Sequence, residues 1–164
     1  MERIPISKEG FDKISQELAD LKAQRPAIIK AIAEAREEGD LSENAGYDAA
    51  RERQGMLEAR INYINSRMPL FDVLDLNTLN GERAIFGSTV EIEDIETEEV
   101  RKFTLLGPDD ADHKRGSISV LSPMGQALLG KEEGDEIVVD APRGKIEYEI
   151  LSVNFLGSEG LKIK

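Results

Sequence analysis

Two acidic side chains, Asp40 and Glu43, stand close together in the stretch 39–47. Two carboxylates are a poor Mg²⁺ site by themselves, because magnesium prefers six oxygen ligands and is often held by one or two carboxylates together with water and phosphate oxygens. The pair makes sense as half of a metal site that another protein and a phosphate chain would complete. In a two-metal phosphoryl reaction, an ion supplied in this way would activate water and stabilise the attacking and leaving oxygens.

The same two residues also fit a purely structural role. Asp40 followed three residues later by Glu43 is a capping box, in which each side chain would satisfy a free backbone amide at the start of a helix. Charges near a turn also favour solubility, although Glu34, Glu37 and Glu38 already supply them here. The metal-binding role and the capping role both remain open from the residues alone.

The elements that would position the pair are two long helices. Apolar residues recur at steps of three and four on both sides of the stretch: Phe11, Ile14, Leu18, Leu21, Ile28, Ile32 and Ala35 before it, and Tyr47, Ala50, Leu57, Ile61, Ile64 and Met68 after it. This heptad spacing is typical of two helices that share a narrow seam. If the heptad positions before the stretch are paired with those after it, starting nearest the stretch and working outward, the two residue numbers of each pair add up to 82. Ala35 pairs with Tyr47 in this way, and Ile14 with Met68. A constant total requires an antiparallel hairpin that bends at Leu41.

The ends of these helices follow from capping and proline chemistry. Ser7 is a good N-cap for the first helix. Pro26 lies inside that helix, but the heptad continues through it, so we expect one bent helix. The second helix ends at Met68 because Pro69 follows. With about thirty residues at about 1.5 Å each, the arm is a rod of about 45 Å that buries little beyond its seam.

The rest of the chain, from Leu70 onward, changes to the alternating pattern of β-strands. Gly and Pro separate the expected strands, which are 71–75, 88–95, 100–106, 117–121, 136–139 and 145–153. One short helix interrupts them, with Ser122 as its cap, Pro123 at its first position and Gly130 past its end. The sequence therefore predicts an α+β protein: a coiled-coil hairpin over 1–76 with its tip at 39–44, and an antiparallel sheet with one helix over 77–164.

Composition and charge exclude several classes of protein. The 164 residues contain no Cys, which excludes disulfides and thiolate chemistry, and no run approaches the length of a membrane span. A reducing cytoplasm is the expected location. The net charge of −12 is uneven, because residues 70–164 hold 10 basic and 20 acidic side chains. Binding to duplex DNA normally needs a basic face, so autonomous DNA binding is not expected.

Other candidate residues favour structural roles. His113, the only histidine, lies in an acidic stretch and is expected to be part of a solvated loop rather than a metal ligand. A triad of Ser117, His113 and Asp112 lacks any nucleophile motif. Arg51 and Arg53 could touch phosphate, but ordinary charged flanks are favoured.

Three blocks of the sequence resemble one family. Residues 31–52 closely resemble the hairpin tip of bacterial Gre-type transcript cleavage factors, and residues 118–135 are similar to the family's C-terminal signature. Residues 85–90 are similar again, and the resemblance covers essentially the whole chain. The near-neutral hairpin looks more like the GreA branch than the strongly basic GreB branch.

The resemblance implies a fold and a function. The coiled coil would be followed by an FKBP-like domain that docks at the rim of the secondary channel of bacterial RNA polymerase. The hairpin would enter the channel, reach the 3′ end of the nascent RNA, and stimulate the polymerase's own cleavage of backtracked RNA, without being an enzyme itself. Asp40 and Glu43 map onto the family's two tip acids, which help to hold the second Mg²⁺ of the polymerase. Leu41, Ser42, Asn44 and Tyr47 would be tip contacts, while Ser122, Pro123 and Met124 map onto the docking segment.

The chain departs from the family pattern at three positions, and two alternatives remain. Ser42 and Gly46 replace a basic and an acidic residue, and Asp48 stands where His is frequent; none of these changes removes the acidic pair. One alternative is a Gre-like inhibitor that occupies the same channel, although such proteins crowd more acids onto the tip. The other is a peptidyl-prolyl isomerase, which would need an aromatic-lined pocket.

Overall fold

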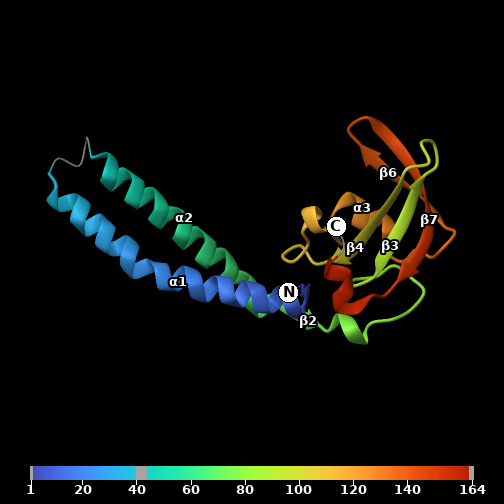
Figure 1. Ribbon diagram of the computed structural model, residues 1–164, viewed down its shortest axis with the longest axis horizontal. Coiled ribbons are helices and arrows are strands. Elements are labelled where there is room, and N and C mark those ends of the chain that lie inside the picture. Colours follow the sequence, from blue (N-terminus) through green and yellow to red (C-terminus); the bar gives the residue numbers. More distant parts are fainter. Residues whose placement is uncertain (1, 40–43, 163–164) are drawn as a thin grey trace. The chain divides into compact units, whose positions relative to one another are not determined.

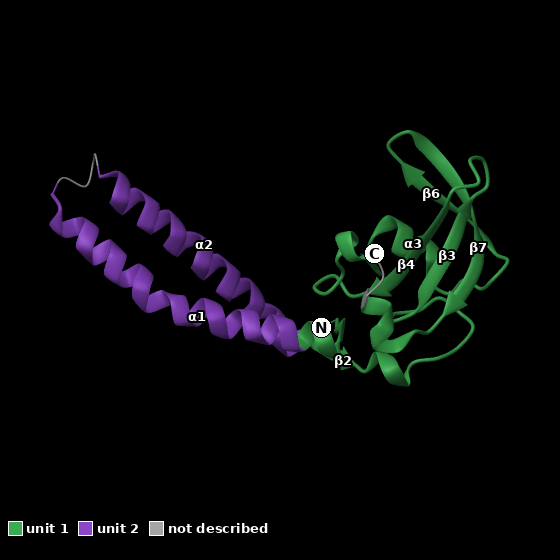
Figure 2. Cartoon of the chain, viewed as in Figure 1, with its two compact units in different colours: residues 1–11, 71–164 green, residues 12–70 purple. Residues whose placement is uncertain are grey.

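The structure, a computed structural model, describes residues 2–39 and 44–162 of the chain. It divides into two compact units, residues 12–70 and residues 1–11 together with 71–164 (Figure 2). We call these the hairpin unit and the sheet unit. No helix within the described residues is long and apolar enough to cross a membrane.

The hairpin unit consists of α1 (Lys8–Glu37), whose first turn belongs to the sheet unit, and α2 (Ala45–Arg67) (Figure 1). Every residue that the two helices bury is a predicted seam position: Ile14, Ile28, Ile32 and Ala35 on α1, and Ala50, Leu57, Ile61 and Ile64 on α2. Two predicted positions lie outside the seam, because Phe11 belongs to the sheet unit and packs edge-on against Phe71, and Met68 lies in the turn after α2. Leu18, Leu21 and Tyr47 pack against the cluster at its margins. The prediction of a hairpin with a narrow seam is therefore confirmed.

Proline and ion pairs shape the two helices. α1 continues through Pro26, as predicted from apolar positions that keep the heptad register on both sides of it. α2 ends at Arg67 and passes into a 3₁₀ turn, Met68–Leu70, that contains Pro69. Arg25 interrupts the apolar seam, and its guanidinium donates two hydrogen bonds, of 2.8 and 2.6 Å, to the carboxylate of Glu58 on the other helix.

The sheet unit contains a five-stranded mixed sheet in the order β5-β4-β3-β7-β6. Its strands are β3 (Thr89–Asp94), β4 (Val100–Leu106), β5 (Ser117–Ser119), β6 (Glu136–Ala141) and β7 (Gly144–Asn154). Four of them pair antiparallel as predicted, but β5 pairs with β4 in parallel because the chain loops back through residues 107–116 before it re-enters the sheet. The single helix α3 (Pro123–Leu128) contributes Leu128 to the core beside Val90, Ile92, Leu105 and Ile150.

A second, small sheet was not predicted. Strand β1 (Ile4–Ser7) pairs in parallel with β2 (Phe71–Leu74), and Arg3 adds a hydrogen bond of 2.7 Å to the carbonyl of Phe71. Residues 1–11 and 71–76 consequently belong with the sheet, whereas a boundary after residue 76 was expected. The physical reason is that a four-residue strand is too short to show an alternating pattern, and its partner lies 67 positions away.

Candidate functional site

The first candidate site is the turn between the two long helices, where Asp40, Leu41, Ser42 and Glu43 lie outside the described residues. Its described flank is Asn44, which caps α2 by accepting a hydrogen bond of 3.0 Å from the backbone amide of Tyr47. The side-chain amide of Asn44 also donates a hydrogen bond of 2.6 Å to the carbonyl of Ala35 in the last turn of α1. One side chain thus satisfies backbone groups of both helices at the turn.

This arrangement corrects the capping-box alternative. α2 begins at Ala45 with Asn44 as its N-cap, so the expectation that Asp40 caps this helix is wrong. Asn is as good an N-cap as Asp, and at this position it also reaches α1. Capping of α2 therefore does not account for the acidic pair.

Tyr47, a predicted tip contact, lies at the margin of the seam. It is half-buried against the hairpin cluster, and the guanidinium of Arg36 lies 5.9 Å from the centre of its ring. Packing is thus its structural role, as its register predicted. Arg51, a possible phosphate contact, donates a hydrogen bond of 2.9 Å to Gln54 on the same helix.

The second candidate site is the turn that leads into α3. Ser122 caps this helix, since its hydroxyl accepts from the amide of Gly125 at 3.1 Å and donates to the carbonyl of Ser119 at 2.6 Å. Pro123 is exposed at the first helical position, and Met124 is half-buried against the core. Beside them Leu121 is 64% exposed, so a rigid turn presents apolar surface to solvent.

The acidic loop around His113 has no catalytic geometry. The hydroxyl of Ser117 hydrogen-bonds the backbone of Asp112, accepting from its amide at 2.6 Å, and the ring of His113 stacks on Phe103 with centroids 6.5 Å apart. The described part of the chain holds no group of three or more His, Cys, Asp or Glu residues that could hold a metal ion. Asp110, which sequence reasoning placed in the same solvated loop, instead hydrogen-bonds the amide of Ser7 at 2.8 Å.

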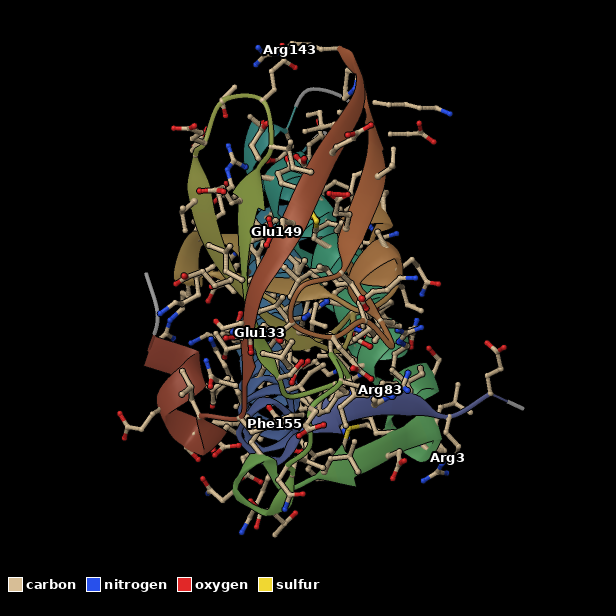
Figure 3. The ribbon with its side chains drawn as sticks, turned by 90° about the vertical axis from the view of Figure 1, so that its right-hand side faces the viewer. Arg3, Arg83, Glu133, Arg143, Glu149 and Phe155 are labelled. Atoms are coloured by element: carbon tan, nitrogen blue, oxygen red, sulfur yellow. The ribbon has the colours of Figure 1, made fainter. Side chains whose placement is uncertain are left out.

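The sheet unit also contains a hollow of about 580 Å³ between the β3–β4 and β6–β7 turns. Figure 3 shows Arg143 at the far end of the β6–β7 hairpin. Tyr148 is the one aromatic residue among those that line the hollow, and charged side chains such as Arg101 and Arg143 line much of the rest. An aromatic-lined pocket of the kind that an isomerase needs is not formed there.

Comparison with known protein families decides what this architecture belongs to. The model described as "Transcription elongation factor, N-terminal" matches residues 4–73, and the model described as "Transcription elongation factor, GreA/GreB, C-term" matches residues 79–155. The chain belongs to the GreA/GreB family of transcription elongation factors. The two matches correspond to the hairpin with β1 and to the five-stranded sheet with α3.

Two individual relatives of high sequence identity agree with this assignment. Transcription elongation factor GreA of Nitratidesulfovibrio vulgaris is 67% identical over 160 residues, which cover 98% of both chains. GreA of Solidesulfovibrio magneticus is 69% identical over 157 residues, or 96% of both chains. Among solved structures, the GreA factor homolog 1 (Gfh1) protein of Thermus thermophilus is 28% identical, with a TM-score of 0.44 over 93% of this chain and 99% of that one.

The family assignment settles the alternatives that the sequence left open. Both of these highly similar relatives are named as GreA elongation factors, so neither an inhibitor nor a peptidyl-prolyl isomerase is favoured. The chain is a transcription elongation factor of GreA type, built as a coiled-coil hairpin followed by an α+β unit.

Proposed function

We propose that this elongation factor binds RNA polymerase in the cytoplasm and stimulates the polymerase's own cleavage of backtracked RNA through a hairpin inserted in the secondary channel. Membership of the GreA/GreB family supports the polymerase as partner. The hairpin supports a reaching role, because a helix of 30 residues is about 45 Å long and buries only one seam. The factor supplies ligands to the polymerase's active site and is not itself the enzyme.

Asp40 and Glu43 are the residues proposed to act there, next to the RNA 3′ end. Their donor set fits Mg²⁺ only in part, because two carboxylates leave most of the octahedral positions to water, polymerase side chains and phosphate oxygens. When bound, the ion would activate water and stabilise the charge that develops on the phosphate. The single observation that carries this assignment is the N-cap at Asn44, since it leaves the two acids without a role in capping α2.

The turn before α3 is the proposed docking segment. Ser122, Pro123 and Met124 lie at a helix start that two hydrogen bonds of Ser122 fix in place. A fixed turn with an exposed Leu121 beside it would bind a partner at little cost in conformational entropy. The five-stranded sheet supports a protein partner rather than duplex DNA, because Glu149 stands opposite Glu136 on one side and Glu93 on the other.

The test is cleavage of RNA in a stalled, backtracked polymerase complex. The double variant Asp40→Asn with Glu43→Gln keeps hydrogen-bonding groups and loses the charge, so we expect cleavage to fall by about 10²-fold or more while polymerase binding persists. The matched control is Glu37→Gln with Glu38→Gln, which removes the same charge from the exposed end of α1 and should cleave normally.

Two results would contradict the proposal. Equal cleavage with the wild-type protein and the Asp40/Glu43 variant would show that the acids hold no ion. An equal loss with the Glu37/Glu38 control would show that only the general negative charge of this end matters.

A further inference from the structure

The start of α1 has a cap that its own sequence does not complete. Ser7 is the N-cap, and its hydroxyl accepts a hydrogen bond of 2.9 Å from the amide of Gly10. In a capping box, the side chain of the third helical residue would in turn accept from the amide of the N-cap. Here that third residue is Gly10, which has no side chain.

Asp110, from the loop after β4, takes the place of the missing side chain. Its Oδ2 accepts a hydrogen bond of 2.8 Å from the amide of Ser7, while its Oδ1 accepts one of 2.7 Å from the amide of Gly107. A Cβ atom added to Gly10 would collide with the Cβ of Asp110. Asp110 thus completes the capping box from 103 residues away and occupies the space that a side chain at position 10 would need.

A short 3₁₀ helix, Gly157–Lys162, contacts the same helical turn. The hydroxyl of Ser158 donates a hydrogen bond of 2.6 Å to the carboxylate of Glu9, the second residue of α1. Ser158 is itself held by Asn77, which accepts from its amide at 3.1 Å and donates to its hydroxyl at 3.1 Å. Two segments that are distant in sequence, those of Asp110 and Ser158, therefore contact residues 7–10, which we call the root of α1.

The length of α1 explains why such a root matters. The helix is 30 residues long, so a rotation of about 10° at its first turn displaces its other end by about 8 Å. A misplacement of about 1 Å can cost a reaction about 10²-fold. An N-cap with only its own hydrogen bond would restrain the direction of this long helix less than one that also contacts Asp110 and Ser158.

We propose that Asp110 is a positioning residue, supported by Ser158, which completes the cap of α1 and holds the root of the helix that carries the tip. The role rests on the proposed function, because it acts through the tip acids and touches neither RNA nor metal. Loss of Asp110 lowers the cleavage rate at saturating factor, whereas the concentration of factor needed for half-maximal cleavage stays unchanged.

Two glycines provide the first test. Both Gly10 and Gly55 lie inside helices, and the space around Gly55 is open. On helix propensity alone, Ala stabilises either position. We expect Gly55→Ala to raise the midpoint of thermal unfolding and Gly10→Ala to lower it, because the new methyl group displaces Asp110. A rise with both variants would overturn the steric part of the proposal.

The second test separates positioning from binding. Asp110→Asn keeps the shape of the side chain but replaces one of its two acceptor oxygens with a donor, and Asp140→Asn removes the same charge from an exposed position on β6. In the backtracked complex, we expect Asp110→Asn and Gly10→Ala to lower the saturating cleavage rate about tenfold, with half-maximal concentrations within twofold of wild type. Asp140→Asn should match wild type in both.

Amide hydrogen exchange on the free protein gives a reading that does not depend on polymerase. We expect exchange at the amides of Ser7 and Gly10 to accelerate at least tenfold in Asp110→Asn and to stay unchanged in Asp140→Asn. Unchanged exchange in Asp110→Asn, or faster exchange with an unaltered saturating cleavage rate, would overturn the positioning role. A wild-type protein that failed to stimulate cleavage would instead refute the proposed function, whatever the exchange result.

Discussion

The two long helices of the hairpin begin in opposite ways. At the root of α1, Asp110 and Ser158, from distant parts of the chain, hydrogen-bond to the N-cap Ser7 and to Glu9. α2 is capped by Asn44, whose partners Tyr47 and Ala35 lie within nine residues of it. A segment that is proposed to enter another protein has no room for contacts from distant parts of its own chain, whereas the first turn of α1 does. The contacts from distant parts of the chain accordingly lie at the start of α1. The cap at the start of α2 uses only residues near it in sequence, and we call it the local cap.

The largest effect on stability is expected from the apolar seam between α1 and α2. Ile61 is fully buried in the hairpin cluster, so Ile61→Ala should lower the free energy of unfolding by about 2–5 kcal/mol through lost burial and the cavity left behind. Met56→Ala, on the same helix at a position 69% exposed, should change it by less than about 0.5 kcal/mol. Urea unfolding of both variants measures the difference, and similar losses would show that the two helices do not share the predicted seam.

A smaller effect on stability is expected at the local cap of α2, which Asn44 forms. Asn44→Ala removes the hydrogen bonds to Tyr47 and to Ala35, and should cost about 1 kcal/mol. Asn44→Ser keeps an N-cap acceptor but is too short to reach α1, so it should recover part of the loss. Amide exchange at the start of α2 should report both changes, with the residues at the root unaffected. Faster exchange at the root as well would show that the two ends are not independent.

Local patterns predicted most of the fold. The heptad steps predicted all the buried positions of the seam, but they also included Phe11 and Met68 at its ends, which lie outside it. Ser7 and Ser122 were recognised as caps because a serine before an apolar periodic segment is a local signal. The cap of α2 was misplaced because Asp40, Ser42 and Asn44 are all good N-caps, and the choice among them depends on a hydrogen bond to Ala35 across the turn. Strand β1 was missed because its partner lies far along the chain.

Among the candidate functional residues, too, those with a local sequence pattern were predicted and the one that depends on a long-range contact was not. The acidic pair could be singled out because its spacing and its place in the hairpin are sequence properties, and its role stays a prediction. Asp110 could not, because nothing near it in sequence shows that Ser7 approaches. One signal was present: Ser7 is followed at the third helical position by Gly10, where a capping box would have Glu or Gln. A good N-cap with glycine at that position indicates that a side chain from elsewhere fills the space.

The smallest expected effect is the pH dependence of stability, which should differ between Asp110 at the root of α1 and Glu17 in the hairpin unit. Burial raises the pKa of Asp110, although hydrogen bonds from the amides of Ser7 and Gly107 act against it. A carboxyl with a raised pKa binds its proton more tightly in the folded protein, so its stabilising contribution is complete below about pH 4 and is lost as the pH rises through the raised value. Between the two long helices, a hydrogen bond from Arg60 lowers the pKa of Glu17. The stabilising contribution of Glu17 is therefore present near neutral pH and is lost as the pH falls.

The two groups therefore predict opposite pH trends. In urea unfolding from about pH 4 to pH 7, the stability of wild type relative to Asp110→Asn should decrease as the pH rises, whereas that relative to Glu17→Gln should increase. Because the side chain of Glu17 is 39% exposed, solvent screens its ion pair and the second trend should be the shallower one. A constant difference between wild type and Asp110→Asn would show that Asp110 keeps its ordinary pKa, with its two amide hydrogen bonds compensating fully for burial. The dipole of α1, which favours negative charge near its first turn, would act in the same direction as these hydrogen bonds.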